Sequence, residues 1–160
     1  MTFDYRSSFE LGHKYSRLVT QRLQDCGVEA DLQPLEFARD VQDRERFTLH
    51  EKDIVTAAGV LEVKSSSRVF GDDPFDYPAS SLIVDTLHGF NAKVRKPVAY
   101  CMVSQATKAM LVVPVSSRHE WWVQNLYDRK REIYDDFLLA NKSVLRSFAE
   151  LVDWLKGKQR

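Results

Sequence analysis

The chain has little of what marks several protein classes. Its two cysteines, Cys26 and Cys101, are spaced neither like zinc ligands nor like a disulfide framework. No apolar run approaches the roughly 18 residues of a membrane-spanning helix, and the first residues lack the apolar core of a secretory signal. The 160 residues carry no net charge and are 44% hydrophobic, which excludes a disordered tail or a collagen-like chain and is typical of one globular domain. We therefore expect a soluble, cytoplasmic protein with reduced, buried thiols.

Two common catalytic signatures are missing as well. The six glycines form no phosphate-binding loop, which excludes ATP-driven models. His50, His88 and His119 are scattered, and none accompanies a G-x-S-x-G motif, so nothing supports a hydrolase triad.

The charge is unevenly distributed along the chain: residues 86–119 contain no Asp or Glu but five Lys or Arg, whereas residues 1–85 hold six more acids than bases. This distribution suits a site that holds cations and meets an anion, although clustering on solvated loops accounts for it equally well.

The hydrophobic pattern predicts an α/β or α+β domain in the order helix, strands, helices. We expect a helix over 6–27, an edge strand within 28–41 and a hairpin from 52–56 and 60–65. Residues 79–88 fit a strand or a short helix, with a strand favoured over 81–86. Paired strands over 98–104 and 109–115 and helices over 118–157 follow, the last helix from Ser143 to Lys156.

The segment from Asp53 to Lys64 carries the sharpest motif. If Ala57 and Ala58 form the tip of the hairpin, Asp53 lies directly opposite Glu62, with Cβ atoms about 4.5–5.5 Å apart. Lys64 then emerges on the same face as Glu62, because side chains alternate along a strand. Two facing carboxylates repel each other, and a divalent cation removes that conflict; oxygen ligands favour Mg²⁺ or Mn²⁺. Two carboxylates, a lysine and a metal ion are typical of phosphodiester hydrolysis.

This combination of Asp53, a short hairpin and Glu62-Val63-Lys64 resembles the core motif of the PD-(D/E)XK nucleases, and small phage-type, resolvase-like members are the nearest comparison. The order of the elements over about residues 6–115 is similar too. The resemblance implies a single α/β domain over residues 1–160, with a restriction-endonuclease-like core, a mixed central sheet flanked by helices and extra C-terminal helices.

The resemblance also implies roles for individual residues. Asp53, Glu62 and the Val63 carbonyl would bind Mg²⁺ or Mn²⁺, and Lys64 would assist the metal-bound water that attacks the phosphorus. An acid on the first helix, Glu10, would support the site. The implied function is that of a metal-dependent DNA nuclease, most simply an endonuclease.

A nuclease also needs contacts with its substrate. The basic residues Lys93, Arg95 and Lys96 would contact the DNA backbone without reading its sequence. Ser65 and Gln105 are candidate phosphate contacts. A solvated loop explains the basic residues equally well, as a polar strand end explains Ser65 and a turn explains Gln105. A homodimer would suit cutting of two strands. Two alternatives stay open: a catalytically inactive nucleic-acid-binding or assembly module of the same fold, and an enzyme for small phosphorylated molecules, which would have a closed pocket.

Overall fold

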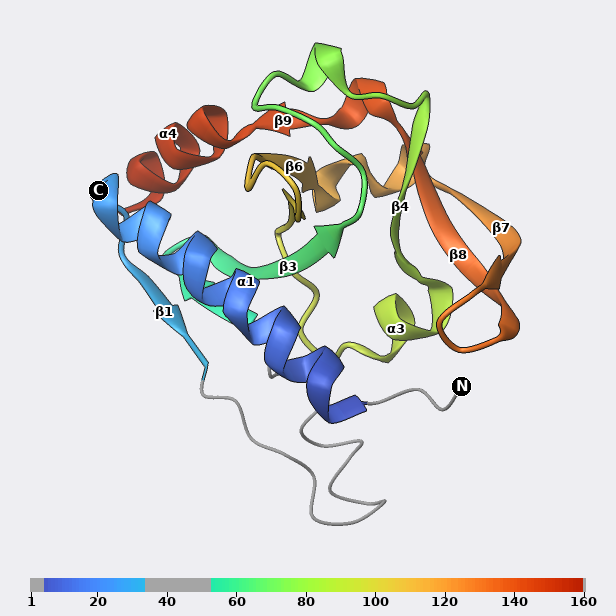
Figure 1. Cartoon of the computed structure of the whole chain (residues 1–160). Coiled ribbons are helices and arrows are strands. Elements are labelled where there is room, and N and C mark those ends of the chain that lie inside the picture. Colours follow the sequence, from blue (N-terminus) through green and yellow to red (C-terminus); the bar gives the residue numbers. More distant parts are fainter. Residues whose placement is uncertain (1–4, 34–52, 160) are drawn as a thin grey trace.

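The computed structural model describes residues 5–33 and 53–159, and of residues 5–10 and Asp53 it describes the backbone alone. Two sheets and three helices form the described part, which confirms the α/β class (Figure 1). The first sheet has the order β1 (Ala30–Leu32), β2 (Asp53–Thr56), β3 (Gly59–Ser66), β5 (Ala99–Ser104), β6 (Met110–Pro114), β9 (Arg146–Ser147). The second has the order β4 (Ser81–Thr86), β8 (Ile133–Asn141), β7 (Trp122–Asp128). The helices are α1 (Tyr5–Asp25), α3 (Leu87–Ala92) and α4 (Phe148–Lys158), with 3-10 turns at Pro74–Asp76, Val115–Glu120 and Lys142–Val144.

The first sheet is mixed. Strand β3 runs parallel to β5, while all other neighbouring strands of both sheets are antiparallel. The parallel pair requires the chain to cross over, and this crossover carries β4 and α3. The connection therefore places a strand of the second sheet and a short helix beside the first sheet.

Side-chain alternation along β5 separates two hydrophobic cores. Cys101 and Val103 belong to the core that also contains residues of α1 and α4. Tyr100 and Met102 point the other way, into the core shared with β4, β8 and α3. Because Glu62 and Lys64 pair with Tyr100 and Met102 in the β3–β5 ladder, both lie on the side of the second sheet.

The hairpin between β2 and β3 turns tightly. Gly59 has a φ of +131°, and a Cβ atom there would lie 2.8 Å from Cγ1 of Val98. Glycine is therefore required by both the backbone conformation and the close approach of the neighbouring segment. Thr56 supports the turn, since its hydroxyl donates to the carbonyl of Gly59 at 2.8 Å.

The C-terminal part differs from the sequence-based prediction. The prediction of helices over 118–157 was wrong for most of that range. These residues form the β7–β8 hairpin and one α-helix, α4. Residues such as Trp122 and Ile133 recur at a spacing that also fits a helix, but the segment is rich in aromatic residues and is broken by a charged turn. Helix α4 begins at Phe148 rather than Ser143, because the hydroxyl of Ser147 caps it by accepting from the amide of Glu150 at 3.1 Å.

Other sequence-based predictions are confirmed or corrected in part. The N-terminal helix, the hairpin, the strand at 81–86 and the paired strands β5 and β6 are present as expected, and β1 occupies part of 28–41. Cys101 is buried as predicted, but Cys26 is exposed at the end of α1. None of the helices within the described ranges has the length and hydropathy that crossing a membrane requires.

Candidate functional site

The register of the β2–β3 hairpin agrees with the sequence-based prediction. Asp53 is the direct partner of Glu62 across the strand pair. The two-residue turn sets this register, because one more residue in the loop would shift every pair. The side chain of Asp53 lies outside the described part, so the structure establishes its backbone position alone.

Glu62 and Lys64 lie on one face of β3, as the alternation predicted. Glu62 is 6% exposed, and its Oε1 atom lies 3.5 Å from Nζ of Lys64. Leu61 and Val63, on the opposite face, are buried in the core with α1 and α4. The apolar half of the strand thus anchors it, while the charged half faces the second sheet.

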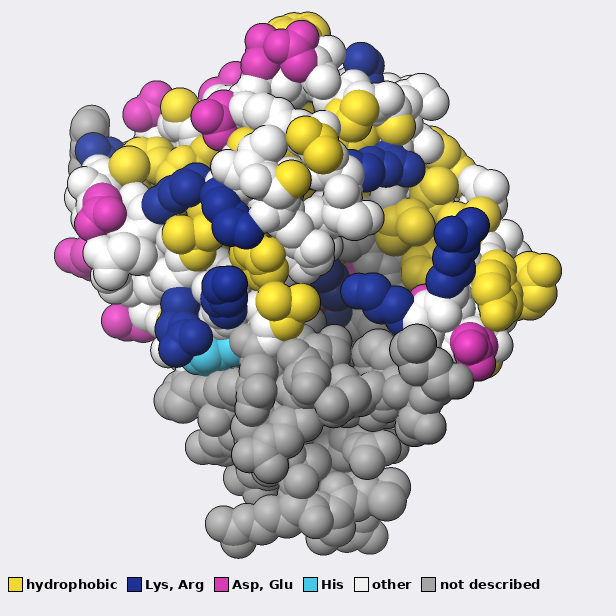
Figure 2. Space-filling view, viewed as in Figure 1, with side chains coloured by type: hydrophobic (Ala, Val, Ile, Leu, Met, Phe, Trp, Pro, Cys, Tyr) yellow, Lys and Arg dark blue, Asp and Glu magenta, His cyan; other side chains and the backbone are white. Residues whose placement is uncertain are grey.

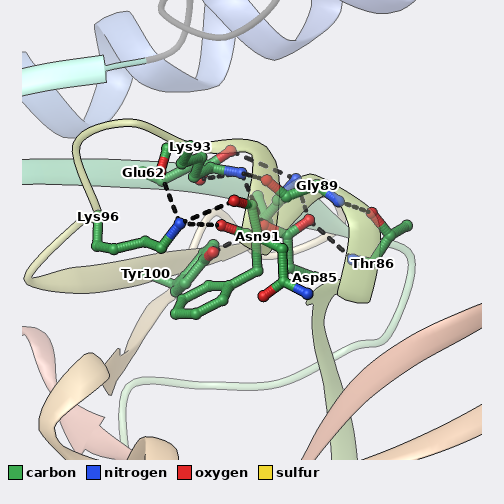
Figure 3. A network of polar contacts seen from close by, with 10 residues as sticks. Glu62, Asp85, Thr86, Gly89, Asn91, Lys93, Lys96 and Tyr100 are labelled. Carbon is green, nitrogen blue, oxygen red and sulfur yellow. Dashed lines mark hydrogen bonds and ion pairs between the residues drawn. The ribbon is translucent and has the colours of Figure 1, made fainter.

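The structure adds a second described carboxylate, that of Asp85 at the end of β4, which the sequence analysis did not single out. Asp85 is 6% exposed, and its Oδ1 atom lies 3.4 Å from Nζ of Lys64. Tyr100 on β5 donates its hydroxyl to Oδ2 of Asp85 at 2.7 Å, and the amide of Thr86 donates to Oδ1 at 2.8 Å. Asp85 is therefore held in a fixed orientation by its contacts with Tyr100 and Thr86 (Figure 3).

A second ammonium group, that of Lys93, lies between the same two acids. Its Nζ atom is 3.1 Å from Oε2 of Glu62 and 2.9 Å from Oδ2 of Asp85, and it donates to the carbonyl of Gly89 at 3.1 Å. Each carboxylate thus has one oxygen beside Lys64 and the other beside Lys93. The described side chains form a closed ring of alternating charges, with no net charge.

This ring shifts the protonation of its members. Burial alone would lower the pKa of Lys64, but the negative charges of Glu62 and Asp85 outweigh it and raise that pKa above its ordinary value. Burial would raise the pKa of Asp85, yet Lys64 and Lys93, with hydrogen bonds from Lys93 and Tyr100, hold it below its ordinary value. Lys64 and Asp85 are therefore both charged near neutral pH.

A pocket of about 470 Å³ opens beside the ring. It brings together Lys64, Ser65 and Gln105, three of the predicted site residues, and the Gln105 amide donates to the Ser65 hydroxyl at 3.2 Å. Arg68 and Lys130 line the same pocket, and Figure 2 shows Lys and Arg side chains around a hollow on this face. A larger pocket of about 810 Å³ lies away from these charges, against α4, and its lining is mostly apolar.

The predicted basic contacts lie differently. Lys93 is 11% exposed within the charged ring, and Lys96 donates to the carbonyls of Phe90 and Asn91 at 2.7 and 3.2 Å, which caps α3. Arg95 and Lys96 are exposed, whereas Lys93 is not. Whether any of them contacts DNA stays a prediction.

For two further predicted site residues, Glu10 and Val63, the structure gives the position of the backbone. Glu10 lies on α1, and its side chain is not among those described. Val63 pairs with Cys101 in the β3–β5 ladder. Their roles in metal binding or support stay predictions.

Few side chains are available to bind a cation, but those present are carboxylates, the ligands that Mg²⁺ prefers. Within residues 11–33 and 54–159, whose side chains are described, no group of three or more His, Cys, Asp or Glu lies close enough to hold a metal. Glu62 and Asp85 form a pair, and among these side chains the buried Oε2 of Glu62 accepts no hydrogen bond, only the ion pair with Lys93. Mg²⁺ needs only one or two carboxylates beside its waters and phosphate oxygens, so the pair fits this ion.

Comparison with known proteins adds no identification. No protein-family model matches the chain, and no curated protein matches it. Functional inference therefore depends on the geometry of this site.

Proposed function

We propose that the protein is a Mg²⁺- or Mn²⁺-dependent DNA nuclease with a restriction-endonuclease-like core. The observation that carries this proposal is the convergence of Glu62, Lys64 and Asp85 within 3.5 Å contacts at the edge of an open pocket. Asp53, the register partner of Glu62, supplies a third acid to the same part of the hairpin. Carboxylates that can hold a divalent cation, with a lysine beside them, suit phosphodiester hydrolysis.

The strand arrangement supports the proposal. A hairpin carries the acid and lysine motif, and the strand after the crossover, β5, runs parallel to the motif strand β3. Helix α1 packs against the opposite face of this sheet. A helix followed by a hairpin that carries the motif and by two later strands, β5 and β6, is the order that the family resemblance implies.

The residues have separable roles in this proposal. Glu62 and Asp85, with Asp53, would hold the cation, which when bound supplies charge neutralisation and activation of water. Lys64 keeps its positive charge beside both acids and is 29% exposed at the pocket. It can therefore contact a phosphate oxygen and stabilise negative charge that develops there.

The pocket walls suit a polyanion better than a small neutral ligand. Arg68 and Lys130 add positive charge to the pocket lining, and Ser65 with Gln105 adds hydrogen-bonding groups. Backbone contacts of this kind position nucleic acid without reading its sequence.

One observation favours a second candidate, a DNA-binding module without catalysis. The carboxylates of Glu62 and Asp85 are each already compensated by two ammonium groups, so the ring needs no metal to remain stable. Such a module would bind DNA through the same pocket but leave it intact.

Incubation with labelled DNAs separates the two candidates. The set consists of a linear duplex, a single strand, a nicked duplex and a four-way junction, each with Mg²⁺, Mn²⁺ or EDTA. A nuclease cuts at least one of them only with the metal, and Lys64→Met abolishes the cutting. Binding without cutting under every condition would favour the module, and cutting that survives Lys64→Met would overturn the assigned site.

A further inference from the structure

The two lysines of the charged ring occupy different environments. The Lys64 side chain is 29% exposed and lines the pocket, whereas that of Lys93 is 11% exposed and is not part of the pocket lining. Lys64 contacts Oε1 of Glu62 and Oδ1 of Asp85, and Lys93 contacts the other oxygen of each acid. The Lys93 ammonium is thus placed between two carboxylates on the side away from the pocket.

The backbone around Lys93 is also less constrained than that around Lys64. Lys64 lies within β3 and is paired with Met102 in the β3–β5 ladder. Lys93 caps the C-terminus of the six-residue helix α3 and begins an irregular connection to β5, in which Val94 is 89% exposed. Lys93 can therefore withdraw through a change in this connection, without disturbing a sheet ladder.

Withdrawal of Lys93 would leave the carboxylates well arranged for another cation. Glu62 would lose an ion pair but no hydrogen bond at Oε2. Asp85 would keep its hydrogen bonds from Tyr100 and from the Thr86 amide. The pair would then carry net negative charge, which a divalent cation neutralises.

We propose that the Lys93 ammonium occupies the position between Glu62 and Asp85 that the divalent cation takes, so that the Lys93 contact and cation binding exclude each other. This inference rests on the proposed function, because it concerns the same acids. Lys93 is a positioning residue in this account: it keeps the acids together in the metal-free protein and weakens their affinity for the metal.

Calorimetric titration with Mn²⁺ tests the proposal in the full chain. Lys93→Met removes the competing charge but keeps the length of the side chain, and it should bind Mn²⁺ at least about tenfold more tightly than the unaltered protein. Lys96→Met removes the same charge from the same connection and should bind as the unaltered protein does. The Lys96 ammonium contacts the carbonyls of Phe90, Asn91 and Lys93 and the ring of Phe90, and neither Glu62 nor Asp85. Equal or weaker binding by Lys93→Met would overturn the proposal, as would absence of Mn²⁺ binding in every variant.

A measurement on the unaltered protein keeps the proposal testable should Lys93→Met fail to fold. Acetylation of each lysine by acetic anhydride is followed by mass spectrometry with and without saturating Mg²⁺. We expect Lys93 to react several-fold faster with Mg²⁺, and Lys158, which is exposed on α4, to react at the same rate in both conditions. An unchanged Lys93 rate would contradict the exchange.

Neither readout depends on DNA cleavage. If Mn²⁺ affinity and Lys93 reactivity change as expected while no DNA is cut, the nuclease proposal fails and the cation exchange stands. If metal-dependent cutting occurs while both readouts stay unchanged, the exchange fails and the nuclease proposal stands.

Discussion

Glu62 on β3 and Asp85 on β4 belong to different sheets, yet their carboxylates share the same two ammonium groups at 2.9–3.5 Å. The shared lysines join the second sheet to the first through buried charge. An acid removed from this ring leaves an excess of positive charge where water can provide little compensation. The ring is therefore a determinant of stability as well as the candidate site.

Asp85→Asn should lower the free energy of unfolding by about 3 kcal/mol, because it breaks a buried set of ion pairs and leaves Lys93 undercompensated. Urea denaturation measures the loss. Asp136→Asn is the matched control: Asp136 is exposed and contacts Asn125 at 3.0 Å on the β7–β8 hairpin, so it should change stability by less than about 0.5 kcal/mol. Equal effects of the two substitutions would contradict the importance of the ring.

The stability of the protein should decline in acid partly through Asp85. Its folded-state pKa lies below the ordinary value of 3.8, so its contribution is present above that value and is lost as pH falls through the folded-state pKa. We expect the stability difference between the unaltered protein and Asp85→Asn to be constant above about pH 5 and to shrink below about pH 4. Unfolding curves at a series of pH values measure this; a difference that stays constant down to the lowest pH would contradict the assignment.

Gly89 tests how closely α3 packs against the ring. A Cβ atom at this position would lie 2.6 Å from Oγ1 of Thr86, which caps α3, and 3.1 Å from Oδ1 of Asp85. Alanine gains about 1 kcal/mol of helix propensity, but losing the cap and displacing the acid cost about 2 kcal/mol. Gly89→Ala should therefore lower the free energy of unfolding, measured by urea denaturation, by about 1 kcal/mol net. Gly71→Ala is the control and should be close to neutral, because nothing lies within 4 Å of the added Cβ atom. Equal stability of the two variants would show that Thr86 and Asp85 adjust freely.

The two thiols should react very differently. Cys101 is 0% exposed, and burial raises its pKa from 9.0 to about 12, whereas Cys26 is exposed. A thiol reagent such as Ellman's should modify one cysteine per native chain near neutral pH and both after denaturation. Cys26→Ser should abolish the native reaction, and rapid modification of Cys101 in that variant would contradict the placement of β5 in the core.

The Glu62 and Lys64 pair could be predicted from sequence because it depends on local geometry. A two-residue turn sets the partner of Asp53, and strand alternation sets the face of Lys64. Asp85 and Lys93 could not be found in this way, because they come from the crossover between β3 and β5 and reach the site only when the second sheet packs on the first. The acid-free stretch that begins after Asp85 marks the region, and Lys93 within it was predicted as a DNA contact, but the sequence indicates neither Asp85 nor the position of Lys93 between two acids.

The β7–β8 hairpin shows a second limit of sequence patterns. Its outer half is exposed on both faces, as with Tyr134 at 72% on one face and Ile133 at 46% on the other, so the strands show no clear inside-to-outside alternation. The apolar positions that remain recur at helical spacing. The pairing of β8 with β4, which buries Leu138, decides the structure and is a tertiary contact.

The rate of DNA cleavage with Mg²⁺, compared between Glu62→Gln and Asp136→Asn, tests the proposed function most directly. Both substitutions exchange a carboxylate for an amide of the same shape, and circular dichroism establishes that each variant is folded. The account predicts cleavage that EDTA stops, that Asp136→Asn retains, and that Glu62→Gln reduces at least about a hundredfold. Cleavage that Glu62→Gln leaves intact, or no metal-dependent cleavage of any DNA by the unaltered protein, would contradict it.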